Sequence, residues 1–396
     1  MSVSNRWLLP DGVDELLPPE AWSVELMRRS MLDIYDRYGY QLVTPPLIEY
    51  LESLLTGTGN NLDLQTFKLT DQLTGRMMGV RADITPQVAR IDSHLLKSQG
   101  VSRLCYVDTV LHTRPEHMLT NRSPLQIGCE LFGEADSSAD LEVISLMMET
   151  MRVAGIRSVH IDLAHVGIYR GLVEAAALPA AVEERLLDAL SRKSIPELDA
   201  LVDASGAVAP VVAIIRDIAN LSGGTDALDK IRQSLSALGD KTPSAVMLAI
   251  DELQLMSGNI QKRFPDVEIG FDFCELRGYN YHTGIMFAAY TPGYGYALAK
   301  GGRYDDIGKD FGKSRPATGF SADLKTLVRL SSGQHSTDRG GIVAPAGDDS
   351  ALLEEIKKLR ETDRVIQRLN NQDQTARFGC DRQLVLREGQ WLVEAF

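Results

Sequence analysis

Apolar and polar residues recur along the chain with two different periods, and these periods predict its secondary structure. Apolar residues that alternate with polar or small ones predict β-strands, at 66–70, 76–81, 104–110, 125–132, 158–163, 267–274, 285–289 and 297–305. Apolar residues near a 3.6-residue spacing predict helices, at 19–38, 139–154, 170–193, 195–204, 225–238, 243–263 and 319–328. Short loops join many of these strands, which indicates a large antiparallel sheet flanked by helices, of the α+β class.

The order of these elements predicts three domains in a chain of 396 residues, which is too long for one ordinary domain. Residues 167–263 are rich in alanine and leucine and carry only helical patterns, so they predict a helical insertion between two strand-rich halves. Those halves, 1–166 and 264–330, are expected to form one core. Residues 338–396 carry a short strand-helix-strand pattern, which predicts a small C-terminal α/β domain.

Composition narrows the class of protein. The net charge is −13 and no lysine- or arginine-rich block occurs, so we expect no nucleic acid partner. No apolar run approaches a membrane span and no charged-then-apolar leader precedes the first helix, so we expect no membrane contact. The 4 cysteines form no C-x-x-C pair, which predicts buried thiols in a reducing cytoplasm, and the 7 histidines lack metal-ligand spacing.

One polar stretch, residues 275–287, follows a predicted strand and holds the densest candidate chemistry. Two glycines punctuate it, and between them lie an arginine, aromatic residues and hydroxyls: Arg277, Tyr279, Tyr281, His282 and Thr283. Such a set suits a small-molecule pocket in which Arg277 clamps a carboxylate, since glycines let a ligand approach the backbone. The alternative is an ordinary hairpin with one solvated arginine.

Two further places put polar side chains where a ligand site can form. Thr85 is predicted to cap a helix whose first residue is Pro86, and Asp83 just before it either holds an ammonium group or complements the helix dipole. Gln126 and Glu130 are four apart on one strand, so they share a face that is otherwise apolar. A buried carboxylate needs partners, which are either a polar ligand or a structural ion pair with a residue such as Arg103.

Four motifs then resemble one family in the same order along the chain. Residues 277–284 closely resemble the R-G-L-D-Y-Y-T-G histidine-binding signature of histidyl-tRNA synthetases, and residues 81–90, 126–133 and 301–305 match the same family. The resemblance covers roughly residues 8 to 330 and implies a class II aminoacyl-tRNA synthetase-like antiparallel sheet. Pro45 and Pro46, after the first helix and strand, look like the dimer-interface motif of that class, although residue patterns alone also allow a plain helix-strand unit.

The resemblance also implies a histidine pocket. By analogy with the family, Asp83 and Thr85 hold the α-amino group of L-histidine and Gln126 and Arg277 reach its carboxylate. Glu130 and Tyr281 hydrogen-bond the imidazole. Asn280 and His282 replace an aspartate and a second tyrosine of the family, so the ring contacts differ in detail.

The chain departs from the family where ATP chemistry takes place. The arginine that grips the α-phosphate in the family is replaced by His112, and the arginine that holds the adenine and γ-phosphate is replaced by Thr326. Loss of one such stabilising group typically costs about a hundredfold or more in rate. The C-terminal tail is also shorter and more acidic than the family's anticodon-binding domain, so transfer RNA has no evident dock.

A chain that keeps the histidine pocket but loses ATP chemistry is similar to the regulatory subunits of short-form ATP phosphoribosyltransferase, which catalyses the first step of histidine biosynthesis. The resemblance implies a non-catalytic chain without a cofactor, which dimerises, joins a short catalytic subunit in a hetero-octamer, activates it and transmits feedback inhibition by L-histidine. Two alternatives remain: a true histidyl-tRNA synthetase, and a stand-alone histidine-binding protein.

Overall fold

The computed structural model describes residues 7–56, 60–115, 121–205, 209–239, 242–274, 278–279, 281–312, 314–331, 340–373 and 379–396. The chain divides into two compact units, residues 1–16 with 24–332 and residues 17–23 with 333–396. Among the described helices, none is both long enough and apolar enough to span a membrane.

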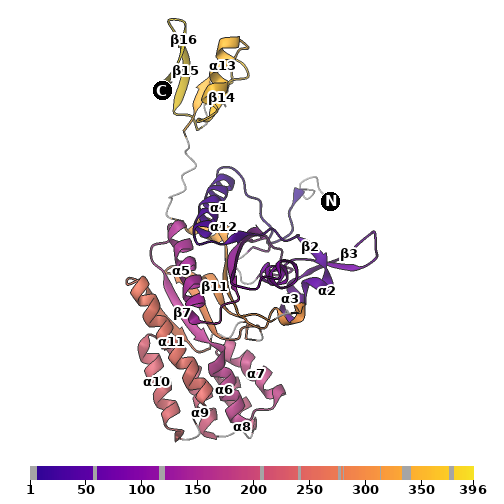
Figure 1. The fold of residues 1–396 in the computed structure, drawn as a ribbon, viewed down its shortest axis with the longest axis vertical. Coiled ribbons are helices and arrows are strands. Elements are labelled where there is room, and N and C mark those ends of the chain that lie inside the picture. Colours follow the sequence, from indigo (N-terminus) through magenta and orange to yellow (C-terminus); the bar gives the residue numbers. More distant parts are fainter. Residues whose placement is uncertain are drawn as a thin grey trace. The chain divides into compact units, whose positions relative to one another are not determined.

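A nine-stranded sheet forms the centre of the large unit (Figure 1). Its order is β1 (Gln41–Leu42), β5 (Ser102–Thr109), β6 (Leu125–Phe132), β12 (Ala317–Asp323), β11 (Tyr294–Arg303), β10 (Ile285–Thr291), β7 (His160–His165), β9 (Glu268–Asp272) and β8 (Ser222–Gly223). The strands from β5 to β7 are antiparallel to their neighbours, whereas β1 pairs with β5 and β7 with β9 in parallel. The predicted α+β class with a large antiparallel sheet is confirmed.

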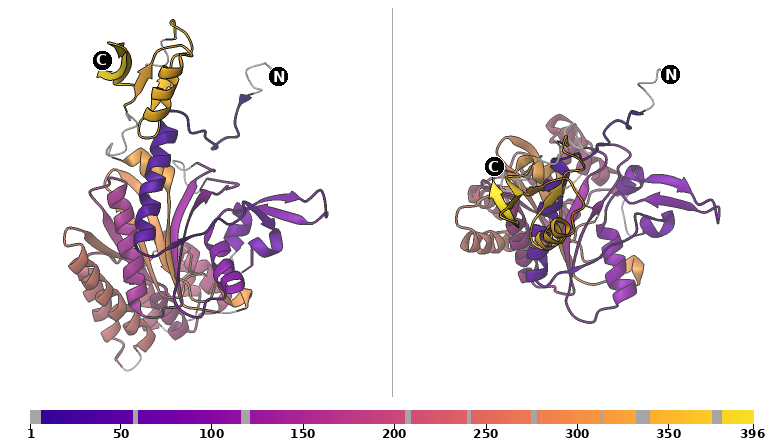
Figure 2. Two further views of the ribbon diagram at one scale, coloured as in Figure 1. Left: turned by 45° about the horizontal axis from the view of Figure 1, so that its top comes forward. Right: turned by 90° about the horizontal axis from the view of Figure 1, so that it is seen from above.

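The two faces of this sheet differ because side chains alternate along each strand. On β6, Ile127, Cys129 and Leu131 belong to the main hydrophobic core, together with apolar residues of α1 (Glu20–Arg37) and α5 (Ser137–Val153). These two helices lie against that face of the sheet (Figure 2). The intervening residues of β6, Gln126 and Glu130 among them, therefore project from the opposite face.

One alternative and one local prediction were wrong. The strands on either side of residues 275–284 do not form a hairpin, because β7 inserts between β9 and β10 and pairs with both. The predicted helix at 319–328 is a strand in its first half: β12 runs to Asp323, and the helix α12 (Leu324–Leu330) begins there. The Asp323 carboxylate accepts the N–H of Lys325 (3.2 Å) and so defines the start of this helix.

Six helices follow β7 and gather into one bundle: α6 (Val166–Ala176), α7 (Ala180–Ser191), α8 (Ile195–Ser205), α9 (Ala209–Ile218), α10 (Thr225–Ser236) and α11 (Ser244–Arg263) (Figure 1). The run predicted as one helix at 170–193 is two helices. The break falls where Ala177 adopts a left-handed conformation (φ 54°) and Pro179 follows, since proline cannot continue a helix. Helix α9 was not predicted.

Smaller elements complete the large unit. Strands β2 (Ile48–Tyr50), β4 (Met77–Val80) and β3 (Phe67–Thr70) form an antiparallel sheet. Around them and beside the main sheet lie α2 (Leu51–Leu54), α3 (Asn60–Gln65), α4 (Thr85–Arg90), a π-helical segment (Ile91–Leu96) and a 3₁₀ turn (Lys309–Phe311).

The small unit contains the predicted strand-helix-strand pattern: β13 (Ile342–Ala344), α13 (Ser350–Leu359), β14 (Val365–Gln367), β15 (Arg382–Arg387) and β16 (Gln390–Ala395). Its sheet has the order β14-β13-β15-β16, with a hairpin between β15 and β16. Ile342, Leu352, Ile356 and Leu384 form the centre of a separate core.

Candidate functional site

Glycines on the central strands leave room for a cavity on the sheet face opposite α1 and α5. A β-carbon at Gly319 of β12 would overlap the carboxylate of Glu130, and one at Gly302 of β11 would lie 2.9 Å from the imidazole of His282. Glycine in a strand often marks a close approach of another group to the backbone. Here the two glycines allow the side chains of Glu130 and His282 to lie directly against the sheet.

The structure brings together five of the six residues predicted to form the site. A cavity of about 190 Å³ is lined by four of them, Asp83, Thr85, Glu130 and Tyr281. Gln126 lies beside them: its amide donates to Asp83 Oδ1 (2.8 Å), and its oxygen accepts the N–H of Ile84 (2.9 Å). The sixth residue, Arg277, lies outside the described residues.

Glu130 is the most deeply buried polar group of the cavity, with a relative exposure of 1%. Its carboxylate accepts hydrogen bonds from the hydroxyls of Thr85 (2.9 Å), Tyr106 (3.0 Å) and Tyr304. No ion pair to Glu130 occurs among the described residues. Burial raises the pKa of Glu130 to about 8, although the three hydroxyl donors oppose that rise. The cavity thus holds a carboxyl group that carries a proton near neutral pH.

Tyr281 presents an unsatisfied polar group to the cavity. Its ring stacks on that of Tyr304, with centroids 4.9 Å apart and an interplanar angle of 22°. Its hydroxyl oxygen is buried and has no hydrogen-bond partner in the part of the chain that the structure describes. Burial, with the charge of nearby Glu130, raises the pKa of Tyr281 well above its usual value, so the hydroxyl keeps its proton. A buried hydroxyl without a partner typically costs about 1–3 kcal/mol.

Thr85 does not cap the helix as predicted. Helix α4 begins at Thr85 itself, and the backbone N–H of Thr85 donates to Asp83 Oδ1 (3.0 Å). The carboxylate is a stronger acceptor at this positive helix end than a hydroxyl. The Thr85 hydroxyl is therefore left to bond Glu130. The alternative of a structural ion pair between Glu130 and Arg103 is also wrong, because Arg103 pairs with Glu142 (2.7 Å).

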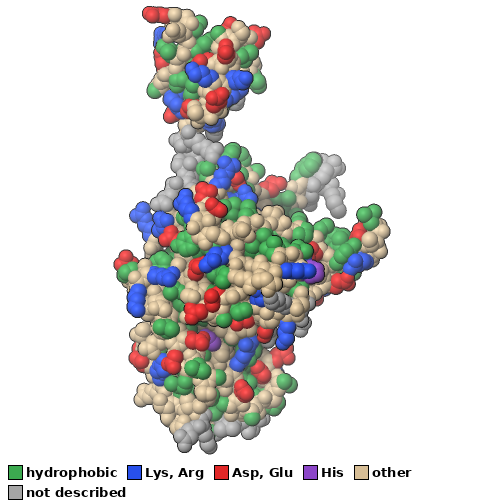
Figure 3. Space-filling model, in the orientation of Figure 1, with side chains coloured by type: hydrophobic (Ala, Val, Ile, Leu, Met, Phe, Trp, Pro, Cys, Tyr) green, Lys and Arg blue, Asp and Glu red, His purple; other side chains and the backbone are tan. Residues whose placement is uncertain are grey.

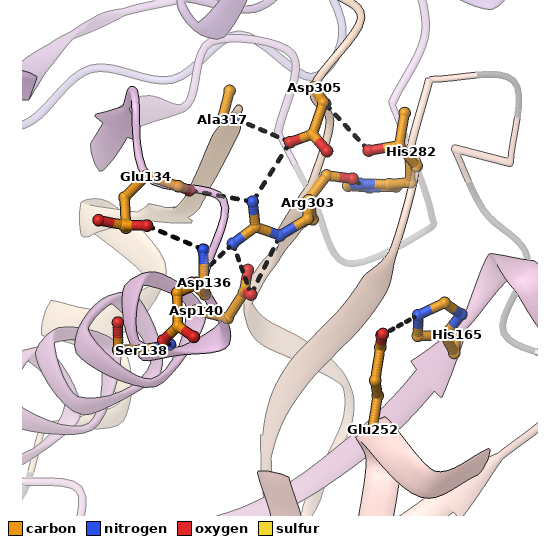
Figure 4. A network of polar contacts seen from close by, with 11 residues as sticks. Glu134, Asp136, Ser138, Asp140, His165, Glu252, His282, Arg303, Asp305 and Ala317 are labelled. Carbon is orange, nitrogen blue, oxygen red and sulfur yellow. Dashed lines mark hydrogen bonds and ion pairs between the residues drawn. The ribbon is translucent and has the colours of Figure 1, made fainter. Parts of the chain in front are cut away.

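His282 lines the cavity from the other side and is oriented by the backbone of Arg303. Its Nδ1 lies 3.2 Å from the Arg303 carbonyl oxygen. Burial lowers the pKa of His282 to about 4, so the ring is neutral and Nδ1–H donates to that carbonyl. Arg303 is itself fixed: its guanidinium bonds the Asp140 carboxylate (2.7 Å) and the Asp305 carboxylate (3.4 Å), as Figure 4 shows. Its side chain supports the site and does not line the cavity.

Sequence patterns missed two tyrosines that hold Glu130. Tyr304 belongs to the motif at 301–305, where the glycines and the arginine drew attention and the tyrosine did not. Tyr106 lies on β5 directly opposite Gly128 of β6, and a β-carbon at that glycine would lie 2.5 Å from its hydroxyl. The glycine between Gln126 and Glu130 was the available signal, since it makes room for a large cross-strand neighbour.

A second cavity, of about 260 Å³, adjoins the first and shares three lining residues with it, Asp83, Lys300 and Ser321. His112 and Thr326 also line it. His112 Nε2 lies 2.9 Å from the carbonyl oxygen of Ala82, and the Thr326 hydroxyl donates to Asp323 Oδ2 (2.7 Å). Among the described residues that line this cavity, Lys300 is the only lysine or arginine.

Comparisons with known proteins agree with this arrangement. The family model described as histidyl-tRNA synthetase matches residues 12–327, and the one described as ATP phosphoribosyltransferase subunit HisZ C-terminal domain matches residues 339–394. The chain is 56% identical over 399 residues to an ATP phosphoribosyltransferase regulatory subunit from Marinobacter nauticus, covering 100% of this chain and 99% of that one. It is 51% identical over 396 residues to one from Pseudomonas aeruginosa, covering 99% of both chains.

The chain belongs to the family of ATP phosphoribosyltransferase regulatory subunits.

Solved structures support the fold at lower identity. A structure from Bacillus halodurans, described as an ATP phosphoribosyltransferase regulatory subunit/histidyl-tRNA synthetase, matches with a TM-score of 0.79 and 24% identity, covering 91% of this chain and 92% of that one. The histidyl-tRNA synthetase from Nostoc sp. PCC 7120 matches with a TM-score of 0.77 and 18% identity, covering 98% and 97%. The predicted class II synthetase-like fold is thus confirmed.

Family membership explains the contrast between the two cavities. The relatives are named as regulatory subunits, so the chain is a regulatory part of an enzyme complex and not its catalytic part. A regulatory subunit needs no adenylyl chemistry. His112 and Thr326, at positions where the resemblance to the synthetases implies arginines, bond to neighbouring protein groups.

Proposed function

We propose that this regulatory subunit senses L-histidine in the cavity lined by Asp83, Thr85, Glu130 and Tyr281, with Gln126 beside it and Arg277 completing the site. In complex with a short catalytic subunit of ATP phosphoribosyltransferase, it activates that subunit and transmits feedback inhibition when histidine binds. Inhibition then requires histidine to favour one state of the complex, through a coupling free energy that is typically about 1–3 kcal/mol.

The observation that carries the proposal is the presence, at one cavity, of a buried carboxyl group without an ion pair and of a buried hydroxyl without a hydrogen-bond partner among the described residues. Glu130 accepts only hydroxyl protons, and the Tyr281 hydroxyl lacks a partner among the described residues. An imidazole has one nitrogen that donates and one that accepts, so it can bond Glu130 and Tyr281 together. Such a site discriminates strongly against rings that lack either nitrogen, because the buried groups would then stay unpaired.

The other end of the amino acid fits the remaining residues. The Asp83 carboxylate can form an ion pair with a protonated α-amino group. The Thr85 hydroxyl, which bonds Glu130, lines the same cavity as Asp83. The Gln126 amide, oriented by Ile84 and Asp83, is available to the ligand carboxylate, which Arg277 would bind through its planar fork.

Assembly and location are part of the same proposal. We propose a dimer through β1, β2 and the turn at Pro45 and Pro46, and a hetero-octamer with the catalytic subunit in the cytoplasm. Apolar side chains around that turn are exposed, Leu42 by 51%, Leu47 by 48% and Ile48 by 43%. Buried Arg81 fixes the turn by donating to the Pro45 carbonyl (2.7 Å). We further propose three domains: a core of residues 1–166 with 264–330, a helical insertion of residues 167–263, and a C-terminal domain of residues 338–396.

The two alternatives fit less well. A synthetase must hold ATP phosphates, and the described lining of the larger cavity offers Lys300 as its only lysine or arginine. On the face shown in Figure 3, acidic and basic side chains of the described residues are interspersed, which gives RNA no continuous basic surface. A stand-alone histidine-binding protein would share the pocket but would not activate a catalytic chain.

The test is an assay of the short catalytic subunit with and without this chain, over a series of histidine concentrations. We expect activation by the chain, inhibition by histidine, and loss of that inhibition with Glu130→Ala. Activation without histidine inhibition would refute the sensor, and no activation at all would favour the stand-alone alternative. Histidine-dependent exchange between ATP and pyrophosphate would establish the synthetase instead.

A further inference from the structure

Residues 278–279 and 281–283 form the segment that carries Tyr281, and both the helical bundle and the sheet bond to it. Arg170, on α6, donates from Nη2 to two backbone carbonyls of this segment, those of Tyr279 (2.9 Å) and His282 (2.9 Å). Its guanidinium also lies over the Tyr279 ring, 4.9 Å from the centroid. Because one side chain bonds the backbone on both sides of Tyr281, a shift of this backbone must move Arg170 or break its bonds.

Tyr279 extends the contact to a second helix. The side chain is buried, with 8% relative exposure, although it lies in none of the described cavities around Glu130. Its hydroxyl donates to Glu183 Oε1 on α7 (3.0 Å), and its ring meets Tyr169 of α6 edge-on, with centroids 5.1 Å apart. The Tyr169 hydroxyl in turn donates to the backbone carbonyl of Glu183 (3.1 Å).

On its other side the segment is tied to the ligand cavity. Thr283 donates its N–H to the Arg303 carbonyl (2.7 Å) and accepts the N–H of Asp305 at its hydroxyl (3.0 Å). Tyr281 stacks on Tyr304, whose hydroxyl bonds Glu130. A continuous path therefore joins Glu130 to α6: it runs through the side chains of Tyr304 and Tyr281, the backbone from Tyr281 to His282, and Arg170. Tyr279 extends it to α7.

We propose that helices α6 and α7 are the output side of the histidine sensor, and that Arg170, Tyr279 and Glu183 are positioning residues that couple them to the ligand cavity. The proposal rests on the proposed function. A ligand shifts an equilibrium only through contacts that differ between two states. Histidine supplies the partner that the Tyr281 hydroxyl lacks, and the segment that moves or stiffens in response is the one that Arg170 holds.

Arg170, Tyr279 and Glu183 line neither of the two cavities described above and do not belong to the predicted site. Their proposed coupling gives the helical bundle a function that composition did not suggest. Coupling of this kind travels through contiguous networks with discrete arrangements, and its demonstration requires a measured coupling. The extent of inhibition at saturating histidine is the suitable readout, because it does not depend on affinity.

The experiment uses the complex with the short catalytic subunit and three variants. Arg170→Met keeps an unbranched apolar stem but loses both carbonyl bonds, and Tyr279→Phe loses the hydroxyl bond to Glu183 while the carbonyl bonds of Arg170 remain possible. The matched control is Arg232→Met in the same bundle, where Arg232 bonds Asp251 (2.6 Å) and Gln254 (2.7 Å) on α11 and does not contact the segment. Histidine affinity is first measured by calorimetry on each isolated chain, so that every assay reaches saturation.

We expect Arg170→Met to retain activation without histidine but to lose at least half of the maximal inhibition. Tyr279→Phe should lose a smaller part, and Arg232→Met none. In the isolated chain, histidine should slow amide exchange in α6 and α7 of the wild type and of Arg232→Met, but not of Arg170→Met. If Arg170→Met fails to fold, Tyr279→Phe decides the question by the same two measurements.

Two results distinguish the failure of this inference from the failure of the proposed function. Full inhibition of Arg170→Met and Tyr279→Phe at saturating histidine, with wild-type exchange in α6 and α7, would overturn the coupling and leave the sensor intact. Absence of histidine binding to the wild-type chain would overturn the proposed function itself.

Discussion

The two adjoining cavities of the sheet differ in how their polar groups are satisfied. In the smaller one, the Tyr281 hydroxyl lacks a partner among the described residues and Glu130 is buried with hydroxyl donors alone. In the larger one, His112 and Thr326 already bond to neighbouring protein groups. A polar group that the protein satisfies internally costs little, whereas an unsatisfied one reduces stability by about 1–3 kcal/mol. This difference supports the proposal that the smaller cavity binds the ligand.

The smaller cavity thus keeps an arrangement that is unfavourable when empty and favourable when filled. This is expected of a sensor, because the ligand then supplies contacts that the empty state lacks. Among the described residues that line the larger cavity, Lys300 is the only lysine or arginine that could contact a phosphate. Substitutions in the smaller cavity should therefore affect histidine binding strongly, and substitutions in the larger one only weakly.

Glu130→Ala should cause the largest loss. We expect histidine affinity to fall by at least about a hundredfold, because the imidazole donor loses its acceptor in a buried site. The fold should persist, since the hydroxyls of Thr85 and Tyr106 lie 3.2 Å apart and can bond each other. Calorimetric titration with histidine and a thermal melt measure the two quantities.

The matched control is Glu142→Ala. It removes a carboxylate of α5 whose Oε1 lies 2.7 Å from Nε of Arg103. It should leave histidine affinity unchanged within about threefold, as expected for a charge without contact to the site. Equal affinities for wild type and Glu130→Ala would contradict the assignment of the carboxylate to the ring.

The pH dependence of histidine binding should be the next largest effect. The pKa of Glu130 is raised to about 8, and a free imidazole titrates near about 6.5. In the proposed site the neutral imidazole donates its N–H to ionised Glu130 and accepts the Tyr281 hydroxyl, so Glu130 must lose its proton when histidine binds. Binding therefore releases a proton below about pH 8 and a second one, from the ligand, below about pH 6.5. We expect affinity to rise with pH and to be about tenfold lower at pH 7 than at pH 9, measured by calorimetry.

Glu130→Gln is the control for that profile, because its amide does not titrate, so the rise in affinity between pH 7 and pH 9 should disappear. Stability provides a second check. Since the pKa of Glu130 in the folded chain exceeds that of an unfolded glutamate, its contribution is present at low pH and is lost as the pH rises through about 8. Between pH 6 and 9 the empty wild type should therefore lose more melting temperature than Glu130→Gln. Parallel profiles would show that Glu130 is not the titrating group.

Tyr281→Phe should reduce histidine affinity by about tenfold, the usual effect of losing one hydrogen bond in a buried site. In the empty chain the same change removes a buried hydroxyl without a described partner, so stability should stay the same or rise. Tyr35→Phe is the matched control, because its buried hydroxyl bonds Thr150 (3.0 Å). That variant should lose about 1 kcal/mol of stability and no affinity. A destabilised Tyr281→Phe with normal affinity would reverse the interpretation.

His112→Ala should have the smallest effect. His112 lies in the larger cavity and bonds the Ala82 carbonyl, so its removal should change histidine affinity by less than about threefold. A calorimetric titration of this variant checks the separation of the two cavities. A loss comparable with that of Tyr281→Phe would mean that histidine extends into the larger cavity.

Much of this site could be predicted where local rules determine the structure. Strand periodicity placed Gln126 and Glu130 on one face, and the polar groups at 83 and 85 were recognised because they precede a helix. The prediction that the Thr85 side chain caps the helix was wrong. Capping rules consider the helix alone, whereas the hydroxyl of Thr85 bonds the carboxylate of Glu130 across the cavity. Tyr106 and Tyr304 were missed for a related reason, since only strand register brings them to Glu130.

The measurement that tests the central claim most directly is a pair of calorimetric titrations of the wild-type chain, one with L-histidine and one with ATP and magnesium. The account predicts saturable binding of one histidine per chain, and no binding of ATP with or without histidine. Absence of saturable histidine binding, or ATP binding that histidine strengthens, would contradict it.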